Sequence, residues 1–335
     1  MARTVIPEGY KPSLELYDTQ KAISLIKRVF EDMLSGELRL RRVSAPLLVT
    51  GDSGLNDNLN GVERPVEFDI PYAETNAQIV HSLAKWKRLA LAQYGFEAGT
   101  GLYTDMNAIR RDEELDNIHS VYVDQWDWEK VMGEGERNIE YLKQTVRDIV
   151  KAICLTQQTL MNVYDVLKYP LNPEVKFITS QELLDLYPNL SAKERENEIV
   201  RQYKTVFLMQ IGGDLSNGKP HDGRAPDYDD WSLNGDLLIW NEVLGETLEI
   251  SSMGIRVDAE AMKRQLALKG RENWANLPFH KQLINGELPQ TIGGGIGQSR
   301  LCMLLLNKAH IGEVQVSIWD ETTKDICSSF GVPLL

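Results

Sequence analysis

The stretch "TIGGGIGQSRLCMLLL", residues 291–306, places four glycines within five positions, followed by an arginine and an apolar run. A phosphate-binding P-loop has Lys-Ser/Thr after its glycines, and a dinucleotide-binding loop has the order G-x-G-x-x-G; this stretch has neither. Two interpretations remain. The glycines either let a buried strand and turn pack closely, or they form a flat surface for a planar base, with Arg300 covering the base or meeting a phosphate.

The length and composition favour one folded unit that does not bind long nucleic acid. The chain has 335 residues, 42% of them apolar, and a formal net charge of −13. Affinity for a nucleic-acid backbone comes from basic residues that displace counterions, and no basic tail is present. No linker divides the sequence, so we expect a single domain over residues 1–335. The acidic balance is typical of an enzyme or a binder of small molecules.

The cysteines and histidines argue against disulfides and against a structural zinc site. The three cysteines are far apart without a C-x-x-C pair, and the five histidines show no H-E-x-x-H spacing. The first residues, "MARTVIPEGYKP", lack the apolar core of a signal peptide, and no apolar run approaches the roughly 20 residues of a membrane span. We therefore expect a cytoplasmic protein without a membrane partner.

Hydrophobic periodicity predicts helices and strands in a mixed order. Apolar residues at spacings of three and four predict a helix over residues 17–36, ended by Gly36. Further helices are expected at residues 81–96, 137–167, 259–270 and 299–308. Strands are expected within residues 38–49, 57–70, 120–131, 206–213 and 236–257. Antiparallel runs of strands, with helices between and after them, favour an α+β fold over a doubly wound parallel sheet.

Polar side chains gather at one of the expected strands. Two arginines and three acids precede residues 120–131, where Gln125, Asp127 and Glu129 share one face. Arginine suits phosphate or carboxylate oxygens, and paired carboxylates suit an ammonium group or Mg²⁺. The alternative is a solvated, charged loop that leads into an edge strand.

Two other clusters of polar residues can be interpreted either as functional sites or as ordinary solvent-exposed surface. Ser82 and Lys87 lie five residues apart on an expected helix and could belong to a site. The alternative is that this helix only presents an exposed basic face. The stretch "HDGRAPDYDDW" carries Asp227, Asp229 and Asp230, which form either a metal site or a solvated loop. The spacing differs from that of an EF-hand, which also ends in glutamate.

Two acids stand on strands that are otherwise apolar. Asp236 and Glu249 occupy such positions within residues 236–257, and Arg256 follows them. A buried acid is costly unless it is paired or bound to a metal ion. We therefore interpret these positions as functional.

Together, these pieces resemble the three motifs of class II aminoacyl-tRNA synthetases. "LIKRVFEDMLSGELRLRRVSAPLL" is similar to motif 1, a helix and strand with Pro46 that forms the dimer interface in that family. "IRRDEELDN…SVYVDQWDWE" is similar to motif 2, and "GGGIGQSRLCMLLL" to motif 3. "HSLAKWK" and "LEISSMGIR" resemble segments of the aspartyl and asparaginyl synthetases. The ordered set is far more specific than any one motif.

One family of this superfamily is free-standing, the ammonia-dependent asparagine synthetases. The strings "HSLAKWKR", "HSVYVDQWDWE", "RAPDYDDW", "SSMGIRVDA" and "PQTIGGGIGQSRL" resemble that family specifically. The resemblance implies an α+β class II synthetase-like core, an antiparallel sheet flanked by helices. It implies that L-aspartate, ATP and ammonia give L-asparagine, AMP and pyrophosphate through a β-aspartyl-adenylate. It also implies Mg²⁺ as cofactor, a homodimer and no tRNA partner.

The nitrogen donor follows in part from residue 2. Residue 2 is alanine, so the N-terminal cysteine nucleophile of glutamine-dependent asparagine synthetases is absent. Free ammonia is therefore the expected donor. Activation of the β-carboxylate rather than the α-carboxylate rests on the resemblance alone.

The resemblance also implies nucleotide-binding residues. Arg110 corresponds to the arginine that bridges the α-phosphate and the reacting carboxylate, while the neighbouring Arg111 fits the spacing of the synthetases instead. Arg300 is expected to stack on adenine and reach the γ-phosphate, and Arg224 to meet pyrophosphate oxygens. The remaining ATP positions are the magnesium ligands and the motif 3 glycines: Asp236, Glu249, Gly293, Gly294 and Gly295.

A second set is expected to hold the amino acid and ammonia. Lys87 and Arg256 would bind substrate carboxylate groups. The side chains that would hold aspartate are Ser82, Gln125 and Asp127, the last through the substrate ammonium. Asp57 and Asp229 lie in segments typical of the family, and either is expected to orient ammonia or take its proton.

Three alternatives make different predictions. A synthetase paralogue, or an asparaginyl-tRNA synthetase core, would activate an amino acid without using ammonia. A regulatory relative without catalysis should have lost the equivalents of Arg110, Glu249 or Arg300, and all three are present. An RNA-binding module conflicts with the charge of −13.

Overall fold

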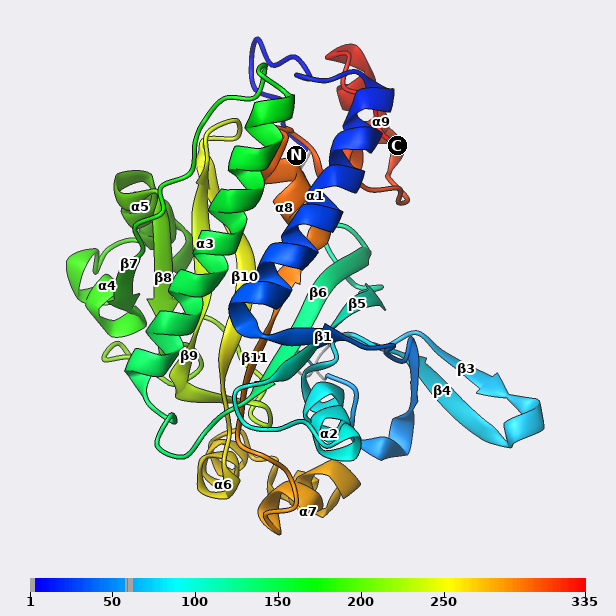
Figure 1. Cartoon of the computed structure of the whole chain (residues 1–335), viewed down its shortest axis with the longest axis vertical. Coiled ribbons are helices and arrows are strands. Elements are labelled where there is room, and N and C mark those ends of the chain that lie inside the picture. Colours follow the sequence, from blue (N-terminus) through cyan, green and yellow to red (C-terminus); the bar gives the residue numbers. More distant parts are fainter. Residues whose placement is uncertain (1–3, 58, 60–62) are drawn as a thin grey trace.

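One mixed β-sheet organises the fold. The computed structural model describes residues 4–57, 59 and 63–335. Within these residues, eight strands pair in the order β1-β5-β6-β11-β10-β9-β8-β7 (Figure 1). Their bounds are β1 Leu40–Arg42, β5 Gly101–Ile109, β6 Tyr122–Val131, β11 Thr291–Gly297, β10 Glu246–Arg256, β9 Asp229–Asn241, β8 Thr205–Met209 and β7 Lys176–Thr179. The six central strands pair antiparallel as expected, whereas the edge strands β1 and β7 pair parallel with their neighbours.

A second, small sheet extends away from the rest of the chain (Figure 1). It has the order β2-β4-β3, with β2 Leu48–Thr50, β4 Thr75–Ile79 and β3 Glu67–Ile70. The expected strand within residues 38–49 is thus divided between two sheets. Pro46 lies between β1 and β2, where it restricts the preceding residue to an extended conformation.

Two long helices, α1 (Leu16–Leu38) and α3 (Ile139–Val163), lie side by side across one face of the main sheet (Figure 1). α3 begins later than predicted, because the side chain of Asn138 accepts a hydrogen bond from the Tyr141 N–H and caps the helix. The other helices are α2 Ala84–Tyr94, α4 Ser180–Leu186, α5 Ala192–Tyr203, α6 Ala259–Leu268, α7 Pro278–Ile284, α8 Gln298–Leu305 and α9 Glu321–Ser329. Short 3₁₀ turns cover Gly51–Ser53, Pro71–Ala73, Glu272–Asn276 and Ile311–Glu313.

The prediction that Gly36 ends the first helix is wrong. α1 continues to Leu38, and Arg39 then adopts a left-handed conformation with φ of 58°. Leu34 and Leu38 are both buried, one turn apart on the face that meets the core. A glycine within a helix costs only about 0.5–1 kcal/mol, less than the gain from burying a leucine, so packing carries the helix through Gly36.

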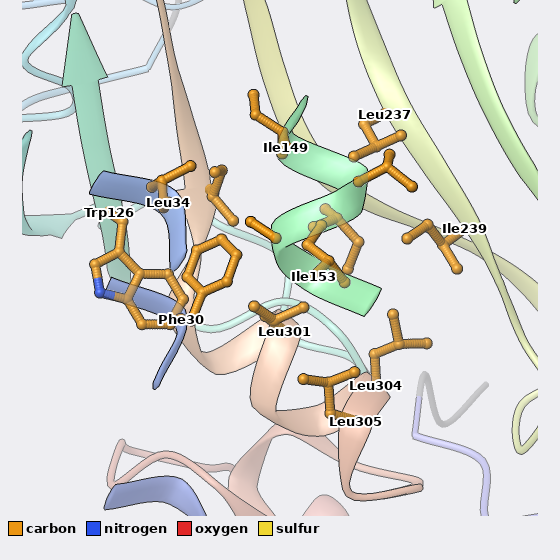
Figure 2. Packing of buried hydrophobic residues seen from close by; sticks show 14 of the residues in the cluster. Phe30, Leu34, Trp126, Ile149, Ile153, Leu237, Ile239, Leu301, Leu304 and Leu305 are labelled. Atoms are coloured by element: carbon orange, nitrogen blue, oxygen red, sulfur yellow. The ribbon is translucent and has the colours of Figure 1, made fainter. Parts of the chain in front are cut away.

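The main hydrophobic core fills the space between the helices and the sheet. Phe30 and Leu34 of α1 meet Trp126 of β6, and Ile149 and Ile153 of α3 point toward β9 and α8 (Figure 2). The rings of Phe30 and Trp126 lie 4.6 Å apart between centroids. This core covers one face of the sheet. On the opposite face, a smaller apolar core packs α4 and α5 against β7, β8 and β9. No helix in the described part of the chain is long and apolar enough to cross a membrane.

Candidate active site

A pocket of about 300 Å³ lies on the face of the sheet opposite α1 and α3. Its lining includes residues of α2, β6, β10, β11 and α8, of the loop after β5, of the segment around Asp57, and of the loop that leads into β9. It gathers most of the predicted residues: Asp57, Ser82, Lys87, Arg110, Gln125, Asp127, Arg224, Asp229, Glu249, Arg256, Gly294, Gly295 and Arg300. Segments that lie more than 200 residues apart in the sequence thus meet at one site.

The alternation of β6 directs polar side chains to the pocket and aromatic ones to the core. Trp126 and Trp128 are fully buried in the core. Gln125 and Asp127 line the pocket, as the predicted shared face implies. Glu129 lies on the same face but is covered. The strand therefore serves the core and the site with successive residues.

The glycines of β11 leave room for the polar side chains of β6. A Cβ on Gly293 would lie 2.0 Å from Oε2 of Glu129, and one on Gly295 would lie 2.2 Å from Oε1 of Gln125. The interpretation of the opening stretch as a closely packed strand is therefore confirmed, whereas binding of a planar base stays a prediction. The glycines belong to a buried strand with close packing, and Gly294 and Gly295 also line the pocket. Gly293 does not line it, since the Glu129 carboxylate lies over it.

Five buried charged groups form one network at the Arg256 end of the pocket. The Lys87 ammonium donates to Asp127 and to the carbonyl oxygens of Trp128 and Gly294, at 2.9 and 3.0 Å. Arg256 donates to Glu129, at 2.7 to 3.1 Å, and also to Asp229. A substrate carboxylate would have to replace one acceptor of Lys87, because its three N–H groups are all used.

This network carries a formal charge of −1, from two cations and three carboxylates. Burial raises the pKa of Asp127 and of Asp229 and lowers the pKa of Lys87. Burial also acts to raise the pKa of Glu129, but the charge of Arg256 holds this pKa below its ordinary value. Asp127 Oδ2 is buried and has no hydrogen-bond partner among the described residues. A cationic group of a ligand would satisfy both the oxygen and the excess charge.

Asp57 and Ser82 are joined at the same end. The Ser82 hydroxyl donates to Asp57 Oδ2 at 2.9 Å, and the Leu59 N–H donates to Asp57 Oδ1 at 2.8 Å. The expected helix around Ser82 starts only at Ala84. Just before the helix, the His81 N–H donates to the side chain of Asn56 at 2.8 Å.

Arginines line the other end of the pocket. Arg110 follows β5 and lines the pocket, whereas Arg111 is exposed and does not. Arg224 donates to Asp222 at 2.7 Å and pairs with Asp236. Arg300 donates to the Glu249 carbonyl at 3.1 Å, which holds its guanidinium beside β10. Three cations in one pocket suit an anionic ligand of several charges.

The two predicted magnesium ligands are neighbours on β9 and β10. Glu249 lines the pocket, while Asp236 lies behind Arg224 and does not. Burial and the nearby Glu249 charge raise the pKa of Asp236 to about 7, although Arg224 opposes this. Two carboxylates that repel each other across adjacent strands fit a divalent cation between them. Groups of three or more metal-binding side chains are absent from the described residues.

Sequence reasoning missed residues that support the site. Tyr228 is half-buried, lines the pocket and lies against the Arg256 guanidinium, which is 5.8 Å from the ring centroid. Asp124 accepts from the Ser299 N–H at 3.0 Å and from its hydroxyl at 2.8 Å, directly before Arg300. The alternation of β6 had assigned Asp124 to the face that the core occupies, so period alone gave no signal for it.

Sequence comparison matches the chain to known proteins over nearly its whole length. A sequence model described as aspartate–ammonia ligase matches residues 17–331. The chain is 56% identical to an aspartate–ammonia ligase of Clostridium perfringens, covering 100% of both chains. It is 56% identical to one from Lactobacillus johnsonii, covering 99% of both, and 57% identical to one from Clostridium tetani, covering 99% of this chain and 98% of that one.

Solved structures share the fold at much lower identity. Asparaginyl-tRNA synthetase of Entamoeba histolytica, in complex with asparaginyl-adenylate, is 14% identical with a TM-score of 0.66. That match covers 90% of this chain and 66% of the synthetase. The Pyrococcus horikoshii enzyme, complexed with the same adenylate, is 16% identical with a TM-score of 0.60, covering 94% and 74%. The predicted class II synthetase-like catalytic core is thereby confirmed.

Proposed function

The chain belongs to the aspartate–ammonia ligase family and is an enzyme of that type, and we propose that it makes L-asparagine through a β-aspartyl-adenylate. The observation that carries this proposal is the division of one pocket into two ends. Arg256 and Glu249 lie seven residues apart on β10, about 23 Å at the rise of a strand. The anionic network lies at the Arg256 end, and the arginines lie at the Glu249 end. An amino acid joined to a nucleotide fits this order.

The amino-acid end is suited to aspartate. The substrate ammonium is placed at Asp127, whose Oδ2 has no partner among the described residues. Arg256 uses three of its five N–H groups on Glu129 and Asp229, which leaves two for a substrate carboxylate. Lys87 keeps Asp127 in place and reaches a carboxylate only by exchanging an acceptor. Ser82 and Gln125 complete the set of hydrogen-bonding groups.

The nucleotide end is suited to ATP. In the first step, a β-carboxylate oxygen attacks the α-phosphorus, the bond to the bridging oxygen breaks, and pyrophosphate leaves. Arg110 stabilises the charge that builds on the α-phosphate oxygens, and Arg224 receives the pyrophosphate. Arg300 is placed to cover adenine beside Gly294 and Gly295. Asp236 and Glu249 would hold Mg²⁺, which supplies further charge neutralisation to the phosphates.

The second step transfers the acyl group to nitrogen. Ammonia attacks the β-carbonyl carbon, the bond to the phosphate oxygen breaks, and AMP leaves while nitrogen loses a proton. Asp57 and Asp229 are the acids proposed to orient ammonia or take that proton. Both are buried and line the pocket at the aspartate end. If neither Asp57→Asn nor Asp229→Asn slows the ammonia step at least tenfold, this assignment fails.

The assembly and setting are proposed as well. Motif 1 corresponds to α1 and β1, so we expect a homodimer through these elements, detectable by sedimentation of the purified chain. The net charge of −13 supports an enzyme that acts without tRNA. We place it in the cytoplasm.

The decisive experiment measures AMP, pyrophosphate and asparagine with ATP, Mg²⁺ and L-aspartate. Ammonium chloride is present or absent, and glutamine replaces it in a parallel reaction. Asparagine that requires ammonium, with glutamine inert, supports the proposal. Exchange of pyrophosphate into ATP that depends on aspartate, without ammonium-dependent turnover, would keep the adenylation step but assign another acceptor. A lack of any aspartate-dependent reaction would overturn the proposal.

A further inference from the structure

A helical insert lies outside the pocket yet contacts the segment that crosses it. Residues 257–290 connect β10 to β11 and contain α6 and α7, at the same end of the molecule as α2 (Figure 1). They pack around a small core of their own, which includes Met262, Leu266 and Phe279. Among the described residues, the pocket lining contains no member of this insert.

The insert is fixed to α2 at both of its ends. Arg88 of α2 is buried and donates to the Val257 carbonyl at 2.7 Å and to the Pro289 carbonyl at 2.8 Å. One guanidinium therefore joins the start and the end of the insert to the helix that carries Lys87. This arrangement gives the insert a defined position relative to the aspartate end of the pocket.

Gln265 of α6 holds the segment that carries Tyr228 and Asp229. Its side-chain amide donates to the Pro226 carbonyl at 3.0 Å and to the Asp229 carbonyl at 2.9 Å. Its carbonyl oxygen accepts from the Trp231 N–H at 2.9 Å. Gln265 is 1% exposed, so these bonds are shielded from bulk solvent. One buried side chain thus makes three hydrogen bonds to the backbone of residues 226–231. Such bonds restrict the conformation of that backbone.

Asp227 fastens the same segment on its other side. Its Oδ2 accepts from Lys85 of α2 at 2.8 Å and lies 3.0 Å from Nε2 of His280 on α7, and all three side chains are buried. Asp227 thus points to the insert, while the next two residues, Tyr228 and Asp229, line the pocket. The segment is thus held by Gln265 of α6, His280 of α7 and Lys85 of α2, none of which lines the pocket.

We propose that the insert is a positioning unit for the aspartate end of the site, with Gln265 as its principal positioning residue. The proposal rests on the proposed function and extends it to residues outside the pocket. The bonds of Gln265 set the backbone of Asp229, which pairs with Arg256, and of Tyr228, which lies against Arg256. The nucleotide-base side of the pocket is built from β10, β11 and Arg300, so it does not depend on these bonds.

The test is Gln265→Met, which keeps the length of the side chain and removes its hydrogen bonds. A matched control is Gln157→Met on α3. Gln157 is also buried and holds a loop, donating to the Tyr169 carbonyl at 3.2 Å and accepting from Leu171 N–H at 2.8 Å, but it lies outside the pocket. Asparagine formation, the KM for aspartate and for ammonium, the Kd of AMP and the Tm are measured for wild type and both variants.

Gln265→Met is expected to lower kcat/KM for aspartate roughly ten- to hundredfold, because a small displacement at a reacting group has effects of this size. The Kd of AMP should stay within twofold of wild type. Gln157→Met should lower the Tm similarly and leave both KM values unchanged. Equal kinetic effects of the two variants would overturn the proposal, as would a loss of AMP binding in Gln265→Met that matches its loss of turnover.

A second variant covers the case in which Gln265→Met does not fold. His280→Leu removes one contact to Asp227 and leaves the Lys85 ion pair, so it should raise the KM for aspartate severalfold with AMP binding intact. Unchanged kinetics in this variant would overturn the proposal. Wild-type protein without asparagine formation would instead reject the proposed function, which separates the two failures.

Discussion

The same strands place apolar side chains on one face of the main sheet and charged side chains on the other. On β6, Trp126 and Trp128 enter the core beneath α1 and α3, while Asp127 and Glu129 enter a buried network of charges. Burying a large apolar side chain contributes about 1.5–3 kcal/mol, whereas an ion taken out of water costs several kcal/mol before it is paired. The difference teaches that the core under α1 and α3 stabilises a sheet whose opposite face, over β6, β10 and β11, is arranged for chemistry.

The largest effect is expected where the charged network is broken. Arg256→Met leaves Glu129 and Asp229 buried without their cation and should lower the free energy of unfolding by about 3–5 kcal/mol. Asparagine formation should be lost together with it. Urea unfolding and turnover measure the two effects. The control is Arg201→Met on α5, whose pair with Glu198 is exposed and should cost less than about 1 kcal/mol. Equal losses in the two variants would remove the contrast between the buried network and the surface.

The apolar face should lose stability without losing chemistry. Phe30→Ala opens a cavity against Trp126 and should lower the free energy of unfolding by about 3–5 kcal/mol. At a temperature where the variant remains folded, its KM values for aspartate and ATP should equal those of wild type. A changed KM would mean that the two faces are coupled through β6.

A titratable group outside the pocket should give the protein a measurable pH dependence. Burial lowers the pKa of His310 from 6.5 to about 4, so the unfolded chain binds a proton before the folded chain does. The free energy of unfolding therefore has its full value, as far as His310 is concerned, above about pH 6.5. It decreases as the pH falls toward 4, by up to roughly 3 kcal/mol.

His310→Asn tests this titration. Asparagine keeps an acceptor for the Gly312 N–H, which His310 Nδ1 now accepts at 3.0 Å, and cannot gain a proton. Unfolding measured at several pH values should show a smaller loss between pH 6.5 and 4 in the variant. Subtracting the two curves removes the contribution of nearby carboxyl groups such as Glu313. Parallel curves would show that His310 does not titrate in this range.

The smallest expected effect is a gain. Gly36 lies within α1, and a Cβ there would meet nothing within 4 Å. Gly36→Ala should raise the free energy of unfolding by about 0.5–1 kcal/mol, because alanine loses less backbone entropy in a helix. Thermal unfolding at a fixed protein concentration measures the change. A loss of stability would indicate that another surface covers this position in the assembled protein.

Particular residues show how far the sequence reaches. The period of two on β6 predicted the shared face of Gln125 and Asp127, and the period of three to four predicted α1 and α3. Gly36 was misread because a local preference of under about 1 kcal/mol gives way to the burial of Leu38. The strand β7 was not predicted at all, and β1 was not recognised as parallel, because pairing direction depends on where the chain returns and not on side-chain period.

The sequence by itself determined the family and the class of fold, and most of the residues that it predicted for the site do line the pocket, because ordered motifs specify residue types and strand faces. The tertiary structure alone decided which groups pair. Lys87 donates to Asp127 and to two carbonyl oxygens. Gly293 is covered by the Glu129 carboxylate, and Asp236 pairs with Arg224. It also decided that Gln265 and His280 reach the segment of Asp229. Pairing of this kind depends on distances between residues that are remote in the chain, and no local pattern encodes those distances.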